Sequence, residues 1–405
     1  MIDKWDKTVK PETSPYFWEG EPEAIESLET PPKTALFMVD LFCGCGGFSV
    51  GFQSAGFTPI LGVDIHPPSL ETFRNNHRYA RVIKGDMRKV KSHLLKEATQ
   101  QKHISVIAAG VPCQGFSLCN RKRHAKDDRN FLFLELIRSV RILKPDFVLL
   151  ENVSGLMSTS NGSFRQAISD AISECGYDVE SLTLNAVEYG VSQLRQRVFF
   201  MGAKRKFSIR WPAPIHKQKT VTVRDAIGDL PPLHAGESET EYKSKPSSDY
   251  QRAMRRRCKV LFNHEAPKHP SEVVRKINST EPGKPMYPKF QQRIRLSPDR
   301  PSPTQVSGGI RPQFQFGHPS QPRGLTVRER CRIQSFPDDF KVYGGVVQGR
   351  VQTGNAVPPL LAKAIAKQMM GAIKGERPTE KTLSKRDAQL ESWKQKRFSL
   401  AKSTV

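Results

Sequence analysis

Apolar runs that are followed by glycine-rich or polar loops constrain the fold more than any other feature of this sequence. They are ALFMVDLF (35–42), PILGVD (59–64), HISVIAAG (103–110), DFVLLEN (146–152) and RVFFMGA (197–203). Stretches with helical apolar spacing, such as FLFLELIRSVRIL, lie between them. Continuous apolar strands are typical of a parallel sheet that helices cover on both faces. We therefore expect an α/β fold with a mostly parallel, twisted sheet.

After about Ala203 the alternation stops, and proline, glycine and basic residues dominate to about Arg323. The segments LTVRERCRIQSF (325–336) and PPLLAKAIAKQMMGAI (358–373) then have helical spacing. At the start of the chain, residues 1–34 are acidic, and we expect little fixed structure there. The predicted organisation is an acidic extension (1–34), a main α/β domain (35–203, completed by 341–375), a smaller irregular domain (204–340) and a charged tail (376–405).

Basic charge is concentrated in one part of the chain. The net charge is +24, and residues 203–325 hold 24 Lys and Arg against 10 Asp and Glu. Residues 1–34 instead hold 4 basic against 8 acidic residues. Segregated basic charge indicates contact with a polyanion, above all nucleic acid, although a solubilising surface is the alternative.

Other bulk features exclude whole classes of protein. No run approaches eighteen apolar residues, and the first residues lack the pattern of a signal peptide, so we expect a cytoplasmic protein, associated with the bacterial nucleoid if it binds DNA. The seven cysteines are scattered and odd in number, which argues against a disulfide framework. Cys43 and Cys45 have the wrong spacing for a zinc site, so we expect no metal.

A glycine loop follows the first apolar run. In DLFCGCGGFSVGF (40–52), Gly44 and Gly46 allow close approach of a ligand to the backbone, and the following helix offers free N–H groups. A nucleotide or S-adenosylmethionine binder fits this pattern, as does a tight structural turn. Asp64 could accept from ribose hydroxyls or cap a helix. Asp86 could receive an adenine amino group or cap a turn.

Two later strands are followed by reactive side chains. Cys113 in GVPCQGFSLCN (110–120) follows an apolar strand, at the sheet edge where α/β proteins bind ligands. Its thiolate could act as a nucleophile, although a lone cysteine is more often inert and buried. Glu151 follows DFVLL and could bond a heterocycle if burial raises its pKa, or it could simply begin a helix.

The segment SQLRQRVFF (192–200) carries alternating polar side chains. Gln193, Arg195 and Arg197 are predicted to share one face of a strand, with Val198 and Phe200 on the other. Arginine can orient a carbonyl or a phosphate, whereas the alternative is a solvated edge strand.

Read together and in order, these segments resemble the cytosine-5 DNA methyltransferase family. RGLTVRERCRIQSFPDDF (323–340) and QTGNAVPP (352–359) resemble its two closing motifs. The resemblance spans Leu36 to Ile373, apart from a variable region between Ala203 and about Ser302. Two departures are small: Ser192 stands where proline often precedes the glutamine, and RGLTVRE has glycine where proline often precedes leucine.

The resemblance implies a Rossmann-like S-adenosylmethionine-dependent methyltransferase fold, with 204–340 as a target-recognition domain for duplex DNA. It implies that Cys113 attacks C6 of a flipped-out cytosine, that Glu151 bonds the ring and that Arg195 and Arg197 orient it. Gln114 and Ser117 would lie near the flipped base and its phosphate. The implied cofactor contacts are Phe42, Gly44, Gly46, Asp64, Ile65, Asp86, Pro112, Leu132, Asn355 and Val357. From charge alone, Arg255, Arg256 and Arg257 form a candidate phosphate-contact cluster.

Three other functions compete with DNA methylation. An RNA cytosine-5 methyltransferase would share the motifs, but the long basic insertion favours duplex DNA. A catalytically silent DNA-binding relative would be free to lose Cys113, Glu151 and Arg195. A nicotinamide oxidoreductase would rest on the glycine loop alone. The resemblance further implies a monomeric bacterial modification enzyme, for which a cognate restriction endonuclease is a possible partner.

Overall fold

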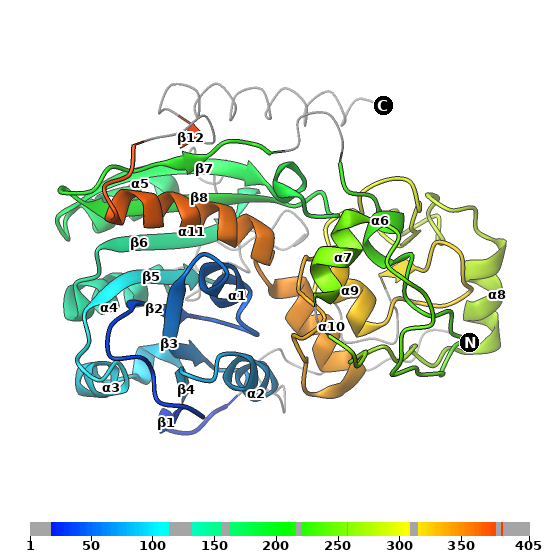
Figure 1. The fold of residues 1–405 in the computed structure, drawn as a ribbon, viewed down its shortest axis with the longest axis horizontal. Coiled ribbons are helices and arrows are strands. Elements are labelled where there is room, and N and C mark those ends of the chain that lie inside the picture. The colour runs from blue at the N-terminus through cyan, green and yellow to red at the C-terminus, as the bar shows by residue number, and fades with distance from the viewer. Residues whose placement is uncertain are drawn as a thin grey trace.

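The structure is a computed structural model, and it describes residues 18–112, 132–155, 163–215, 220–256, 258–307 and 315–377, together with the backbone of 382–383. Figure 1 shows a large sheet with helices on both sides and, next to it, a part with little regular structure. No helix in these ranges is long and apolar enough to cross a membrane.

The main part is built on an eight-stranded sheet in the order β1-β4-β3-β2-β5-β6-β8-β7. Strands β2 to β6 run parallel where they are neighbours, whereas β1 is antiparallel to β4 and β8 is antiparallel to both β6 and β7. All five apolar runs of the sequence form strands, which confirms the predicted α/β fold. The strands are β1 (Glu23–Ile25), β2 (Leu36–Leu41), β3 (Phe57–Asp64), β4 (Arg81–Lys84), β5 (Ile104–Gly110), β6 (Phe147–Val153), β7 (Tyr177–Asn185) and β8 (Gln196–Lys204).

Helices cover both faces of this sheet. Apolar residues of α1 (Gly47–Gln53) and α11 (Pro359–Ile373) pack on one face in a single buried cluster. On the other face, α3 (Ser92–Ala98), α4 (Phe133–Leu143) and α5 (Ser163–Ser173) pack in a second cluster. Because α11 lies beside α1, the end of the described chain returns to the first helix (Figure 1). The helices predicted before Asp146 and over 358–373 are therefore confirmed.

The acidic first segment is more ordered than its composition predicted. Residues 23–25 form β1, whose register pairs Glu23 with Lys84 and Ile25 with Val82. Ile25 also packs against a buried cluster that contains Val82. The expectation of little fixed structure was wrong for this part, because strand pairing and the ion pairs of Glu23 and Glu26 with basic side chains of β4 hold it there.

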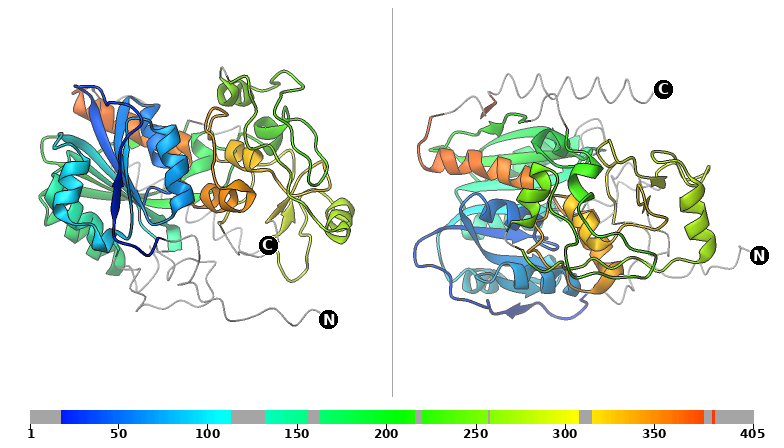
Figure 2. Two further views of the ribbon diagram at one scale, coloured as in Figure 1. Left: turned by 90° about the horizontal axis from the view of Figure 1, so that it is seen from below. Right: turned by 45° about the vertical axis from the view of Figure 1, so that its right-hand side comes forward.

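The second part consists of short helices and loops around a core of its own. Its core joins apolar residues of α6, α7 and α9 with Leu261, Leu296, Phe316 and Leu325. Figure 2 shows this part beside the edge of the sheet at which β2, β5 and β6 end. Its elements are α6 (Val223–Ile227), α7 (Asp249–Arg255), α8 (Ser271–Ser279), β10 (Ile294–Arg295), β11 (Phe316–Gly317) and α9 (Val327–Ile333). The remaining elements are α2 (Pro67–Asn76), η2 (Met87–Lys89), η5 (Ala186–Tyr189), β9 (Trp211–Pro212), α10 (Gly345–Asn355) and β12 (Thr382–Leu383).

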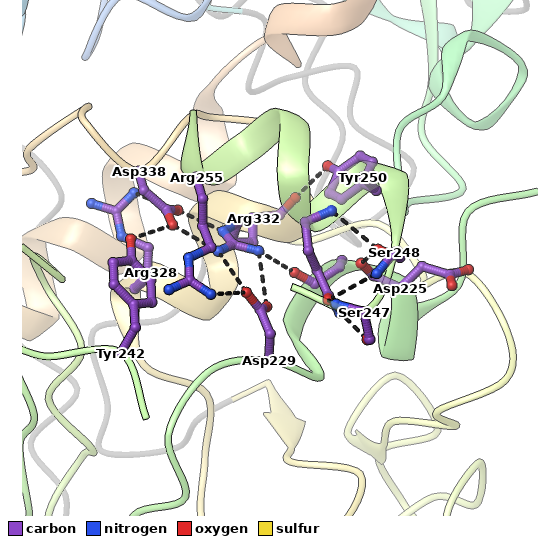
Figure 3. A network of polar contacts seen from close by, with 12 residues as sticks. Asp225, Asp229, Tyr242, Ser247, Ser248, Tyr250, Arg255, Arg328, Arg332 and Asp338 are labelled. Carbon is purple, nitrogen blue, oxygen red and sulfur yellow. Dashed lines mark hydrogen bonds and ion pairs between the residues drawn. The ribbon is translucent and has the colours of Figure 1, made fainter. Parts of the chain in front are cut away.

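The arginines of RGLTVRERCRIQSFPDDF lie in the interior and not on a DNA-facing surface. Arg332 donates to Asp338 at 2.5 and 2.7 Å and contacts Asp229 at 3.2 Å (Figure 3). Arg323 donates to both carboxylate oxygens of Glu329, at 2.7 and 2.9 Å. All of these side chains are buried. The motif therefore forms the polar core of the second part, because each buried charge has a hydrogen-bonded partner.

Candidate active site

Three neighbouring strands end together at one edge of the sheet. The register pairs Leu41 of β2 with Ala109 of β5, and Gly110 of β5 with Glu151 of β6. A Cβ added at Gly110 would lie 3.7 Å from Oε2 of Glu151 and 3.9 Å from the carbonyl oxygen of Phe42. The glycine loop, the end of β5 and Glu151 therefore surround one point, as expected where ligands bind parallel sheets.

Two positions of the glycine loop, Gly46 and Gly47, have no room for a side chain. Gly46 has a φ of 94°, and a Cβ there would lie 2.5 Å from Nε2 of His77. At Gly47 an added Cβ would overlap the carbonyl oxygen of Val357, which shows how closely the GNAVPP segment covers the loop. By contrast, a Cβ at Gly44 would meet nothing within 4 Å. The loop is thus tightly packed beneath and open beside Gly44, which leaves room for a ligand.

Asp64 is tied to this loop. Its carboxylate accepts from the N–H of Gly44 at 2.7 Å and from the N–H of His66 at 2.9 Å. Burial raises its pKa, although these hydrogen bonds oppose the shift. The residue at the N-cap of α2 is His66, two residues after Asp64, so Asp64 lies outside that helix and joins β3 to the glycine loop. The alternative interpretation of Asp64 as the cap of that helix was therefore wrong, and the ribose contact stays a prediction.

Asp86 caps a turn, as one of its two interpretations predicted. It accepts from the N–H of Arg88 at 3.0 Å at the start of η2 and pairs with the Arg88 guanidinium at 2.6 Å. Partial burial raises the pKa of Asp86, but the hydrogen bonds and charge of Arg88 outweigh burial and hold the pKa below its usual value. The carboxylate is therefore ionised and can still accept from a ligand.

Glu151 and Arg197 form a buried ion pair at the end of β6. Nε of Arg197 lies 2.8 Å from Oε1 of Glu151, and the two side chains are 14% and 11% exposed. Burial raises the pKa of Glu151, while the charges of Arg197 and Arg195 oppose that rise. Because β8 is antiparallel to β6, its first residues lie beside the last residues of β6. A carboxyl with a raised pKa and a cation thus lie together at this sheet edge.

The three alternating residues of SQLRQR do not share a strand face. Strand β8 begins at Gln196, so Gln193 and Arg195 precede it. Arg195 is 1% exposed and donates to the carbonyl oxygens of Gln305 and Gly354, both at 3.0 Å. The prediction of one common strand face was wrong, because β8 begins only at Gln196 and Gln193 instead forms a bridge with Ser302. Arg195 connects the two parts of the molecule, whereas Arg197 contacts Glu151.

The other predicted cofactor positions are distributed around the same edge. Ile65 directly follows β3, Pro112 follows β5 and Leu132 stands at the N-cap of α4. Val357 is buried against the glycine loop, and Asn355 ends α10 with an exposed side chain. The predicted nucleophile and its neighbours, Cys113, Gln114 and Ser117, lie outside the described residues.

The basic cluster at 255–257 is divided. Arg255 donates to the carbonyl oxygen of Ser244 at 2.7 Å and stacks over the ring of Tyr242 at 3.7 Å, within the network of Figure 3. Arg256 is 50% exposed and lies 3.9 Å from Asp339. Arg257 lies outside the described residues. The geometry therefore favours Arg256 over Arg255 as a contact for phosphate.

Sequence reasoning missed one buried carboxyl beneath the glycine loop. Asp40 is 1% exposed and accepts from the hydroxyl of Ser49 at 2.7 Å, while its Oδ1 is buried without a hydrogen-bond partner. Burial raises its pKa to about 8, against the hydrogen bonds from Ser49. The signal was an aspartate inside an apolar strand, because such a residue is costly unless it is neutral or paired.

Metal ligands and disulfides do not contribute to the described site. Among the described residues, no group of three or more His, Cys, Asp or Glu is placed to hold a metal ion. The described cysteines, Cys43, Cys45, Cys175, Cys258 and Cys331, are free. Burial raises the pKa of Cys43 and Cys45 well above the usual value, so these thiols of the glycine loop are poor nucleophiles.

Comparison with known proteins decides the family. The model of the C-5 cytosine-specific DNA methylase family matches residues 36–371. The chain belongs to this family. The methyltransferase is 36% identical to the Type II methyltransferase M1.HphI of Haemophilus parahaemolyticus, over 83% of this chain and 87% of that one. It is 35% identical to M.DdeI of Desulfomicrobium norvegicum, over 82% and 88% of the two chains.

Solved structures support the same fold for this methyltransferase. A crystal structure described as a DNA modification methyltransferase encoded within an E. coli prophage superposes with a TM-score of 0.72 and 27% identity. That match covers 84% of this chain and all of the other. The fold is accordingly that of the S-adenosylmethionine-dependent methyltransferases, as predicted, and the chain is a DNA cytosine-5 methyltransferase of the Type II kind.

Proposed function

We propose that this enzyme transfers a methyl group from S-adenosylmethionine to C5 of a flipped-out cytosine in duplex DNA, with Cys113 as nucleophile. The observation that carries the proposal is the buried pair of Glu151 and Arg197 at the end of β6. Glu151 is the register partner of Gly110, and Cys113 follows Gly110 by three residues in the sequence. The pair of Glu151 and Arg197 thus lies beside Gly110, where the chain leaves β5 toward Cys113.

The described residues around the glycine loop fit the cofactor. There is open space beside Gly44, and the carboxylate of Asp64 at the end of β3 and that of Asp86 after β4 lie at the same edge. Asp64 would accept from the ribose and Asp86 from the adenine amino group, with the other predicted contacts lining the pocket. The bound cofactor would supply an electrophilic methyl group for C5 of the base.

The remaining groups act on the base. The Cys113 thiolate would add to C6 of the cytosine, which breaks the C5–C6 π bond and places electron density at C5. C5 would then take the methyl group, with S-adenosylhomocysteine as the leaving group, and loss of the C5 proton would expel the thiolate and restore the double bond. Glu151 would hold N3 and the exocyclic amine, and a raised pKa favours the protonated form that can donate to N3. We assign the contact with O2 to Arg197 and not to Arg195, because three carbonyl oxygens of the protein already surround the Arg195 guanidinium. Arg195 would hold the base site in place.

The second part would grip the duplex from which the base is flipped. Flipping costs a few kcal/mol, and phosphate contacts by a basic surface can offset that cost. We propose 204–340 as this target-recognition domain and 35–203 with 341–375 as the catalytic domain. The core around α6, α7 and α9 supports this division, and a second cluster, in which Val327 and Cys331 pack with Cys45 and Val50, joins the two domains. Arg256, Gln114 and Ser117 are proposed contacts to DNA. The same proposal has the enzyme act as a cytoplasmic monomer.

Covalent trapping tests the reaction directly. A duplex that carries 5-fluorocytosine at the target site cannot lose the group at C5 as a proton, so an attacked base should stay bonded to the enzyme. With S-adenosylmethionine present, we expect a denaturant-resistant complex whose peptide of attachment contains Cys113. Cys113→Ser should still bind the duplex and form no such complex. Attachment through another residue, or trapping with transfer RNA alone, would contradict the proposal.

We further propose that the enzyme works in a restriction-modification system, since its relatives include Type II methyltransferases. DNA from cells that express the enzyme should then resist an endonuclease specific for the same site. An endonuclease that cuts this DNA as readily as unmodified DNA, at every site the enzyme methylates, would argue against the pairing.

A further inference from the structure

A segment ahead of the catalytic domain lies against the predicted adenosine end of the cofactor pocket. Residues 18–29, here called the N-terminal strap, run along the outer edge of β4. The strap precedes residues 36–371, the range that matches the family. Its contacts are therefore a feature of this chain that the family match does not cover.

The first residue of the strap is bonded to a predicted cofactor contact. The N–H of Trp18 donates to the carbonyl oxygen of Ile65 at 2.9 Å. The Trp18 ring lies over the Lys84 ammonium, at 3.7 Å from Nζ to the ring centroid, and its indole N–H donates to the carbonyl oxygen of Glu21 at 3.0 Å. A cation over an indole contributes about 0.5–1 kcal/mol at an exposed site. The turn formed by residues 18–21 thus holds the backbone of Ile65 through a hydrogen bond.

The turn leaves no room for a side chain at Gly20. A Cβ there would lie 2.7 Å from the Trp18 ring. The indole therefore folds flat over the strap backbone, and a larger residue at position 20 would displace it from Lys84.

Pro22, in the middle of the strap, packs against Gly85, the residue before Asp86. A Cβ at Gly85 would lie 2.8 Å from Cα of Pro22, so the two backbones are in direct contact. Lys84, which precedes Gly85, pairs with Glu23 at 2.9 Å and with that residue in the strand register. The strap thus touches the backbone on both sides of the adenosine site: at Ile65 after β3 and at Gly85 after β4.

We propose that the N-terminal strap is the outer wall of the adenosine pocket and that Trp18 is a positioning residue for the cofactor. This inference rests on the proposed use of S-adenosylmethionine. Holding Ile65 and Gly85 before the ligand arrives reduces the ordering cost of binding, because these backbone segments need not be fixed again. The remote pair of Arg78 and Glu29 holds the far end of the strap and touches neither segment.

Calorimetric titration with S-adenosylhomocysteine, without DNA, tests the proposal on the full chain. Trp18→Ala and Gly20→Val should each raise Kd about tenfold, equivalent to about 1.4 kcal/mol. Trp18→Phe should recover most of the affinity, since an aromatic ring remains to pack over the Lys84 ammonium. Arg78→Gln is the matched control and should keep Kd within about twofold of the wild type.

Thermal unfolding without ligand separates positioning from stability. If the strap only stabilises the fold, Trp18→Ala will lower Tm and leave Kd and binding stoichiometry unchanged, which would overturn the proposal. An equal loss of affinity in Arg78→Gln would overturn it as well. Wild-type enzyme that fails to bind S-adenosylhomocysteine would instead contradict the proposed cofactor.

Discussion

At the scale of the residue, a carboxyl and a guanidinium with little access to water define the chemistry of the site. The sequence motifs predicted Glu151 and both arginines, but identical spacing cannot show which guanidinium meets the carboxyl. That choice depends on where β8 begins, and Gln196 is its first residue. Long-range contacts to Gln305 and Gly354 remove Arg195 from the pair, and no local pattern reports such contacts.

Replacing the carboxyl tests its assignment to the base. Glu151→Gln should lower kcat by about 10²-fold or more, because an amide cannot exchange a proton with N3. The Kd for S-adenosylhomocysteine should stay close to that of the wild type, measured by calorimetry. Lost cofactor affinity with near-normal kcat would place Glu151 in the other pocket.

The carboxyl of Asp40 predicts a pH dependence of stability. Its pKa is about 8 in the folded enzyme and 3.8 in the unfolded chain, so the folded state binds the extra proton between these values. The free energy of unfolding should therefore fall as pH rises from about 4 to 8, by up to about 1.4 kcal/mol per pH unit from this group. In Asp40→Asn that component should vanish. Denaturant titrations of both proteins at pH 5 and pH 8 check this, and parallel curves would refute it.

At the scale of the element, long periodic segments were predictable and short ones were not. The five apolar strands and the helices α4 and α11 follow from hydrophobic period alone, and the short helix α9 lies within the predicted helical segment 325–336. Helices α6 and α7 have only 5 and 7 residues and depend on capping boxes at Thr222 and Ser248. Strand β1 is acidic, and its pairing with β4 depends on partners more than fifty residues away.

Helix α9 provides a test of the buried charges. Glu329 closes the capping box with Thr326 and neutralises Arg323. Glu329→Gln should lower the free energy of unfolding by about 3–5 kcal/mol, since it leaves Arg323 buried without a counter-charge. Glu241→Gln, which alters a surface pair with Lys243, is the control and should leave chemical denaturation unchanged. Equal stabilities for the two variants would show that the interior pair is dispensable.

At the scale of the whole molecule, charge composition predicted a polyanionic partner but overstated the surface available to it. Arg295 and Arg323 belong to the basic region and are buried. The carboxyl ends of β2, β5 and β6 face the second part, so a duplex held there would meet the site (Figure 2). Sequence order alone could not show this juxtaposition, because it depends on hydrogen bonds from Arg195 to Gln305 and from Arg330 to Thr353 of α10.

Arg255 and Arg256 are adjacent in sequence, but we expect Arg256 to bind DNA and Arg255 to stabilise the fold. Arg256→Ala should weaken duplex binding a few-fold and reduce the slope of log K against log salt by about 1, as expected for one lost phosphate contact. Arg255→Ala should mainly lower Tm, because its guanidinium lies in the interior network. Fluorescence anisotropy at several salt concentrations and thermal unfolding distinguish the two. A reversed pattern would refute this division.

The central claim is that this enzyme methylates cytosine C5 in DNA through Cys113. Bisulfite sequencing of DNA from a host without its own cytosine methylation, expressing either the wild type or Cys113→Ser, tests it most directly. The wild type should protect cytosines within one recurring sequence, and Cys113→Ser should protect none. Protection by Cys113→Ser, or no protection by a folded and expressed wild type, would contradict the account.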